Sequence, residues 1–70
     1  MKSGVELLND YIADGFKIET AALITAGERI LSVRLNNGGN VVLLPFRGEQ
    51  LHPVRDYLRK ENVDVQEISF

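Results

Sequence analysis

Residues 30–46 have the sequence ILSVRLNNGGNVVLLPF, and this stretch decides the fold. Its centre, Asn36–Asn40, contains an Asn-Gly pair between two apolar runs, which is typical of a hairpin turn because both residues accept positive φ. Before the turn, Glu28–Leu35 alternates between apolar and polar residues, as a half-buried strand does. After it, Val41–Phe46 is apolar on both faces. Such a short connection predicts two antiparallel neighbours.

The segment that precedes the hairpin predicts a third strand. Lys17–Thr25 alternates, with Ile18, Thr20, Ala22 and Ile24 on one side. The pair Ala26-Gly27 then forms a turn, because glycine accepts the positive φ that tight turns require. Together the three runs predict an antiparallel meander.

A helix is expected over Gly4–Asp14. Ser3 and Glu6 have the spacing of a capping box, in which both side chains bond free backbone N–H groups of the first turn. Gly15 is the expected end of the helix, with Phe16 folding back on it. The buried stripe is expected to contain Val5, Leu8, Tyr11 and Ile12.

A second helix is expected over Gln50–Glu61, with Pro53 in its first turn, where the missing N–H costs nothing. Asn62 is expected to end it in the left-handed region. Val63–Phe70 then predicts a short strand whose alternation breaks near Gln66-Glu67, as at a bulge or a frayed end. The expected buried stripe contains Leu51, Val54, Tyr57 and Leu58.

The order of elements predicts one α+β domain over residues 1–70: helix, three-stranded meander, helix and short strand, with both helices on one sheet face.

The chain contains no cysteine, which excludes disulfides and thiolate metal sites. Its net charge of −2 argues against a strongly basic nucleic-acid binder. Apolar runs are too short for a membrane span, and acids come too early for a signal peptide, so we expect a cytoplasmic protein with no membrane partner.

The sheet face away from the helices is the candidate binding surface. The residues expected to face the helices are Ile18, Ala22, Ile24, Leu31, Val33, Leu35, Val42, Leu44 and Phe46. Large aliphatic residues then remain on the opposite face. Exposed apolar patches usually mark interfaces. A strand shifted by one residue, or a final strand folded over this face, would remove the patch. The predicted partner-binding residues are Leu23, Ile30, Arg34, Asn37, Gly38, Val41 and Leu43, and a homodimer is expected through Leu23, Ile30, Val41 and Leu43.

Catalytic patterns are missing from the sequence. His52 is the only histidine, and a metal site needs three or four convergent ligands. The glycines of the hairpin precede a strand, whereas a phosphate cradle precedes a helix. We therefore expect no enzyme activity, no cofactor and no metal.

A basic cluster is the alternative binding surface. Arg55 and Arg59 share a helix face, and Arg47 and Lys60 lie near them in the sequence. Guanidinium and ammonium groups of this kind bind nucleic-acid phosphates. These four residues are the candidate nucleic-acid contacts, although Glu49, Asp56 and Glu61 intervene.

Two resemblances follow from this order of elements. ILSVRLNNGGNV, residues 30–41, looks like the central hairpin of small phage-encoded inhibitors of the anti-CRISPR kind, with helices at similar distances on either side. Leu7-Leu8-Asn9-Asp10-Tyr11 resembles the first helix of a double-stranded RNA-binding domain. That family holds a lysine cluster at the start of its second helix, where this chain has Gly48–Pro53.

The leading interpretation is a small non-enzymatic module that binds another protein or itself, in the manner of a phage or mobile-element inhibitor. The alternatives are a nucleic-acid-binding domain and an accessory subunit of a larger complex.

Overall fold

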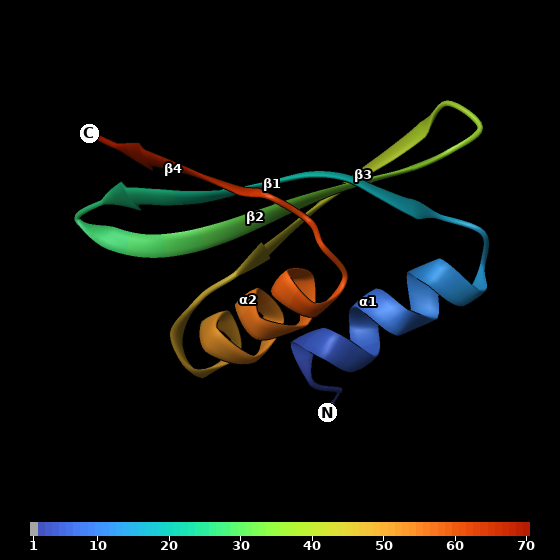
Figure 1. Ribbon diagram of the computed structural model, residues 1–70, viewed down its shortest axis with the longest axis horizontal. Helices are drawn as coiled ribbons and strands as arrows, with labels where there is room; N and C mark the ends of the chain where they lie inside the picture. The colour runs from blue at the N-terminus through green and yellow to red at the C-terminus, as the bar shows by residue number, and fades with distance from the viewer. Residues whose placement is uncertain (1) are drawn as a thin grey trace.

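A computed structural model describes residues 2–70 and has the predicted α+β architecture. Within these residues both helices lie on one side of the sheet, and no helix covers the other side (Figure 1). The predicted order of helix, three-stranded meander, helix and short strand is confirmed. The elements are α1 (Gly4–Ala13), β1 (Lys17–Ala26), β2 (Glu28–Asn37), β3 (Asn40–Phe46), the 3-10 turn η1 (Gly48–Gln50), α2 (Leu51–Lys60) and β4 (Val65–Ser69).

The sheet has the strand order β3-β2-β1-β4. β1, β2 and β3 form the antiparallel meander, whereas β4 pairs parallel with β1 from Ala21↔Val65 to Thr25↔Ser69. Parallel pairing needs a crossover connection, and α2 provides it between the two edges of the sheet. The last strand therefore widens the sheet and leaves its second face open. β4 pairs residue for residue, so the predicted irregularity near Gln66-Glu67 is wrong.

Both helices begin and end near the predicted residues, and each ends in the same local motif. The hydroxyl of Ser3 accepts the first-turn N–H of Glu6 at 3.2 Å, which is one of the two capping-box bonds. The N–H of Phe16 then bonds the carbonyl of Tyr11 at 3.0 Å, and the two rings pack edge to face with centroids 5.3 Å apart. At the end of α2, Asn62 has a φ of 58°, as predicted. Both ends are Schellman motifs, which satisfy the last helical carbonyls.

The core lies between the helices and the inner sheet face. Most of the two predicted helix stripes reach it, but Ile12 is 39% exposed. From the first strand, Ala21 and Leu23 are buried in place of the predicted Ala22 and Ile24. The buried apolar residues are Leu8, Ala21, Leu23, Leu31, Val33, Leu35, Phe46, Leu51, Val54 and Leu58.

Gly4 allows α1 to approach α2 and β3 closely. An added Cβ would lie 2.7 Å from Cγ2 of Val54 and 2.9 Å from Cδ1 of Phe46, inside the normal packing distance. Only a residue without a side chain fits there, because close-packed interiors have no free volume to receive a methyl group.

Candidate functional site

The open face of the sheet is the face that neither α1 nor α2 covers (Figure 1). Side chains alternate between the two faces along each strand, so the registers place every residue. The open-face residues include Thr20, Ala22 and Ile24 of β1, Ile30, Ser32, Arg34 and Asn36 of β2, Val41, Leu43 and Pro45 of β3, and Gln66 and Ile68 of β4.

A β-bulge at Glu19 sets which residues of β1 reach this face. Ile18 pairs with Leu35 and Thr20 pairs with Arg34, so Glu19 is an extra residue in the ladder. An extra residue reverses the alternation of everything after it. The prediction that Leu23 lies on the open face is therefore wrong, since Leu23 is 2% exposed and belongs to the core.

The same shift brings three isoleucines together. Ile24 pairs with Ile30 on one side and with Ile68 on the other, which forms a continuous row across β2, β1 and β4. Ile68 is 38% exposed, and the other two are half-buried. We call Ile24, Ile30 and Ile68 the isoleucine row. Sequence reasoning identified only Ile30, because the positions of Ile24 and Ile68 depend on the bulge and on the pairing of β4.

A second apolar group lies on β3. Leu43 is 63% exposed and Val41 is 45% exposed, so both predicted residues are on the open surface. Pro45 lies between this group and the isoleucine row, opposite Ser32. Ala22 and Ser32 lie in the same cross-strand row as Pro45. The open face therefore offers two apolar areas separated by this row.

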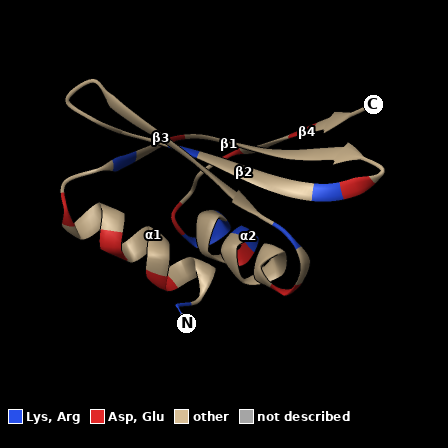
Figure 2. Cartoon of the chain, turned by 180° about the vertical axis from the view of Figure 1, so that it is seen from behind, with Lys and Arg blue, Asp and Glu red and all other residues tan. Residues whose placement is uncertain are grey.

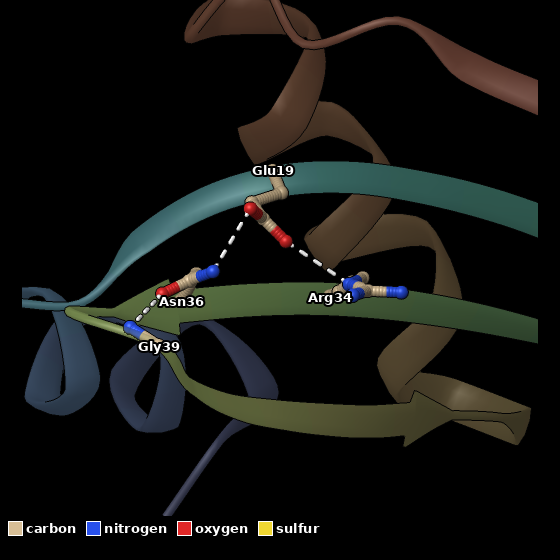
Figure 3. A network of polar contacts seen from close by, with 4 residues as sticks. All are labelled: Glu19, Arg34, Asn36 and Gly39. Carbon is tan, nitrogen blue, oxygen red and sulfur yellow. Dashed lines mark hydrogen bonds and ion pairs between the residues drawn. The ribbon is translucent and has the colours of Figure 1, made fainter.

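Four residues near the hairpin end of the face form one connected polar network: Glu19, Arg34, Asn36 and Gly39 (Figure 3). The Glu19 carboxylate accepts Nε–H of Arg34 at 3.0 Å and Nδ2–H of Asn36 at 3.0 Å. Oδ1 of Asn36 in turn accepts the backbone N–H of Gly39 at 2.9 Å. The bulge residue thus orients Arg34, which lies between Thr20 and Leu43 on the face, and links it through Asn36 to the hairpin turn.

The tip of the β2–β3 hairpin lies on the opposite side of the sheet from the helices (Figure 1). Gly38 and Gly39 occupy the two turn positions with φ of 59° and 97°, which requires residues that tolerate positive φ. The turn is therefore one residue later than the Asn-Gly pair predicts. Gly38 is exposed at the tip, whereas Asn37 is half-buried and donates to the carbonyl of Asp14 at 3.3 Å. Asn37 thus anchors the hairpin to the end of α1.

The four candidate nucleic-acid contacts lie in three places. Arg47 bonds the carboxylate of Glu28 at 3.2 Å, near the β1–β2 turn. Arg55 and Arg59 instead line a cavity of about 400 Å³ beside β4. Lys60 is the last residue of α2, whose one acidic residue, Asp56, stands between Arg55 and Arg59 in the sequence (Figure 2). The structure brings together Arg55 and Arg59 but places Arg47 at a different cavity.

The remaining titratable groups do not converge. His52 is exposed in the first turn of α2. Residues 2–70 hold no cluster of side chains suited to a metal ion, and none of their helices has the length and hydropathy to cross a membrane.

The Tyr57 hydroxyl donates a hydrogen bond to Oδ1 of Asn9 at 3.0 Å. Partial burial raises the pKa of Tyr57 above 10.0, and the negative charge of Glu61 raises it further. This pair joins the two helices on the side away from the open face.

Comparison with known proteins adds no relative: no protein family, curated protein or solved structure matches this chain.

Proposed function

We propose that this chain is a protein-binding module that docks a partner protein on the open face of its sheet. The chain functions by covering part of the partner's surface, as a small inhibitor or an accessory subunit does. It catalyses no reaction itself. The observation that carries the proposal is the pair of apolar areas on one uncovered face, formed by the isoleucine row and by Val41 with Leu43.

The proposed partner presents an apolar patch that is bordered by polar groups. Complete burial of a leucine or isoleucine contributes about 1.5–3 kcal/mol. Leu43 is still 63% exposed, so most of its contribution is available to binding. Arg34 lies on the face directly beside Leu43, and the hairpin tip lies at one end of the face, so both offer polar contacts next to the apolar areas. The hydrogen bond to Glu19 already restrains the Arg34 side chain, so this side chain loses less conformational entropy when the partner binds.

A matched pair of glutamate substitutions tests this proposal. Leu43→Glu places a charge on the open face, and Ile12→Glu places the same charge on an exposed isoleucine of α1. Each tagged variant is used to capture proteins from a lysate of the source cells, with nuclease treatment throughout. We expect one partner to be retained by the natural chain and by Ile12→Glu but lost with Leu43→Glu, while both variants stay as stable as the natural chain.

Two results would contradict the proposal. Equal retention by Leu43→Glu and Ile12→Glu would place the partner elsewhere on the molecule. Capture that depends on intact nucleic acid, and that weakens steeply with salt, would favour binding through Arg55 and Arg59 instead.

A further inference from the structure

The outer edge of β4 carries backbone groups that are free to pair. Backbone N–H and C=O groups of alternate residues point to opposite edges of a strand. The N–H of Phe70 donates to the carbonyl of Thr25 at 3.0 Å, so Phe70 and the residues in phase with it face β1. Val65, Glu67 and Ser69 have the opposite phase, and their N–H and C=O groups therefore point away from the sheet.

The other edge of the sheet is protected. Asn37 and Asn40 are the pair that closes the two-residue turn, so the backbone groups of Asn40 point toward β2. Because this direction alternates along a strand, the backbone N–H and C=O groups of Val41, Leu43 and Pro45 are on the outer side of β3. Proline has no N–H, so this edge lacks a donor at one of its outward positions. β4 contains neither proline nor a bulge. Of the two edges, β4 is the one that can accept a further strand without losing hydrogen bonds.

We infer that the occupant of this edge is a second copy of the chain, paired antiparallel through β4 about a two-fold axis at Glu67. In this register Glu67 faces Glu67 of the second copy, and Val65 faces Ser69. Each of these pairs exchanges both N–H···O bonds, because all outward-pointing groups have the same phase. The outward groups of β4 are thus complementary to themselves, as an isologous dimer contact requires.

The charges at the axis also fit a second copy. Two glutamates directly opposite each other destabilise an antiparallel pair. Here Nη2 of Arg55 lies 3.6 Å from Oε1 of Glu67, on the helix side of the sheet. A two-fold axis brings a second guanidinium to the same place, so two carboxylates meet two arginines. Arg55 therefore offsets the repulsion that a lone edge glutamate would create.

The dimer would also enlarge the open face. Gln66 and Ile68 point to that face, and the two-fold register sets Gln66 of one copy beside Ile68 of the other. The Ile68 residues of the two copies are then diagonal neighbours on a single continuous sheet. Edge pairing nevertheless does not require that the open face bind another protein, so this inference is independent of the proposed function.

The test combines sedimentation equilibrium with residue-resolved amide exchange on the full chain. We expect a reversible dimer, with dissociation measurable below about 1 mM. The amides of Val65, Glu67 and Ser69 should become protected as protein concentration rises, because no strand covers them in the monomer. A chain that stays monomeric at about 1 mM, or a dimer in which these amides exchange freely, would overturn the inference.

Substitutions at Ser69 separate this contact from association through the open face. Ser69→Pro removes an outward N–H while sparing the bonds to β1, and we expect it to weaken dimerisation at least about tenfold. Ser69→Val is the matched control that keeps the N–H and should dimerise normally. Leu43→Glu should also leave dimerisation unchanged. Loss of the dimer with Leu43→Glu, but not with Ser69→Pro, would assign self-association to the open face and refute edge pairing.

Discussion

Deletion of Glu19 tests the strand phase on which the open face depends. Glu19 is the extra residue of the bulge, and the residues on either side of it already face neighbouring residues of β2. Removing it makes Ile18 and Thr20 consecutive, and every other pair of the ladder keeps its partner. We therefore expect the shortened chain to fold with Leu23 still buried.

The expected loss of stability comes only from the Glu19 side chain. Its ion pair with Arg34 is half-exposed, and such pairs contribute about 0.2–1 kcal/mol. Its bond to Asn36 contributes about 0.5–1.5 kcal/mol. The deletion should thus lower the free energy of unfolding by about 1–2 kcal/mol. Glu19→Ala removes the same contacts but keeps the bulge, so it is the matched control and should lose a similar amount.

Urea unfolding followed by far-ultraviolet circular dichroism measures both variants. If β1 were regular and had no bulge, Ile18 and Leu23 would lie on opposite faces, and the deletion would change which of these core-facing side chains is in phase with β2 and turn an apolar side chain to solvent. Loss of a buried leucine from a core costs about 2–5 kcal/mol, which is a large part of the stability of a domain this small. A deletion variant that is less stable than Glu19→Ala by more than about 2 kcal/mol would refute the assigned phase.

Two further predictions concern the packing of the helices. Gly4→Ala should lower the free energy of unfolding by about 1–3 kcal/mol, because its methyl group would lie 2.7 Å from Cγ2 of Val54. In a double-mutant cycle, Val54→Ala should recover part of this loss. If the effects of the two substitutions on stability are simply additive, the close approach is contradicted. For Tyr57, whose pKa is raised above 10.0 by partial burial and then by Glu61, the native state keeps the phenolic proton longer than the unfolded state does. Stability should therefore be unaffected by this group below about pH 9 and should fall as pH rises through and above 10. Urea midpoints across this range should fall less steeply for Tyr57→Phe, and an equal slope in both chains would exclude Tyr57 as the cause.

Local sequence was sufficient for the elements and their ends. The capping serine, the left-handed Asn62 and the glycine-rich turn each act within a few residues, so their conformations follow from short-range sterics and hydrogen bonds. The hairpin was predicted for the same reason, although its turn lies one residue later because Gly38 and Gly39 both take positive φ.

The candidate site was only partly predictable. Val41 and Leu43 were placed correctly because a tight turn fixes the register of β3 from the hairpin outward. Leu23 was misplaced because either phase of β1 offers comparable apolar residues, and the bulge that decides between them depends on contacts with β2. Ile68 was missed because its neighbour, Ile24, is remote in the sequence.

The composition and local patterns of the chain therefore determine its helices, its meander and the helix-covered face. Tertiary structure alone decides where β4 pairs, which side of β1 is buried and which aliphatic residues meet on the open face. The physical reason is that side chains of a strand alternate between two faces, so one extra residue in a bulge exchanges the buried and exposed side chains that follow it. Such a bulge, or the choice of a neighbouring strand, changes these faces without changing the β propensity of any residue.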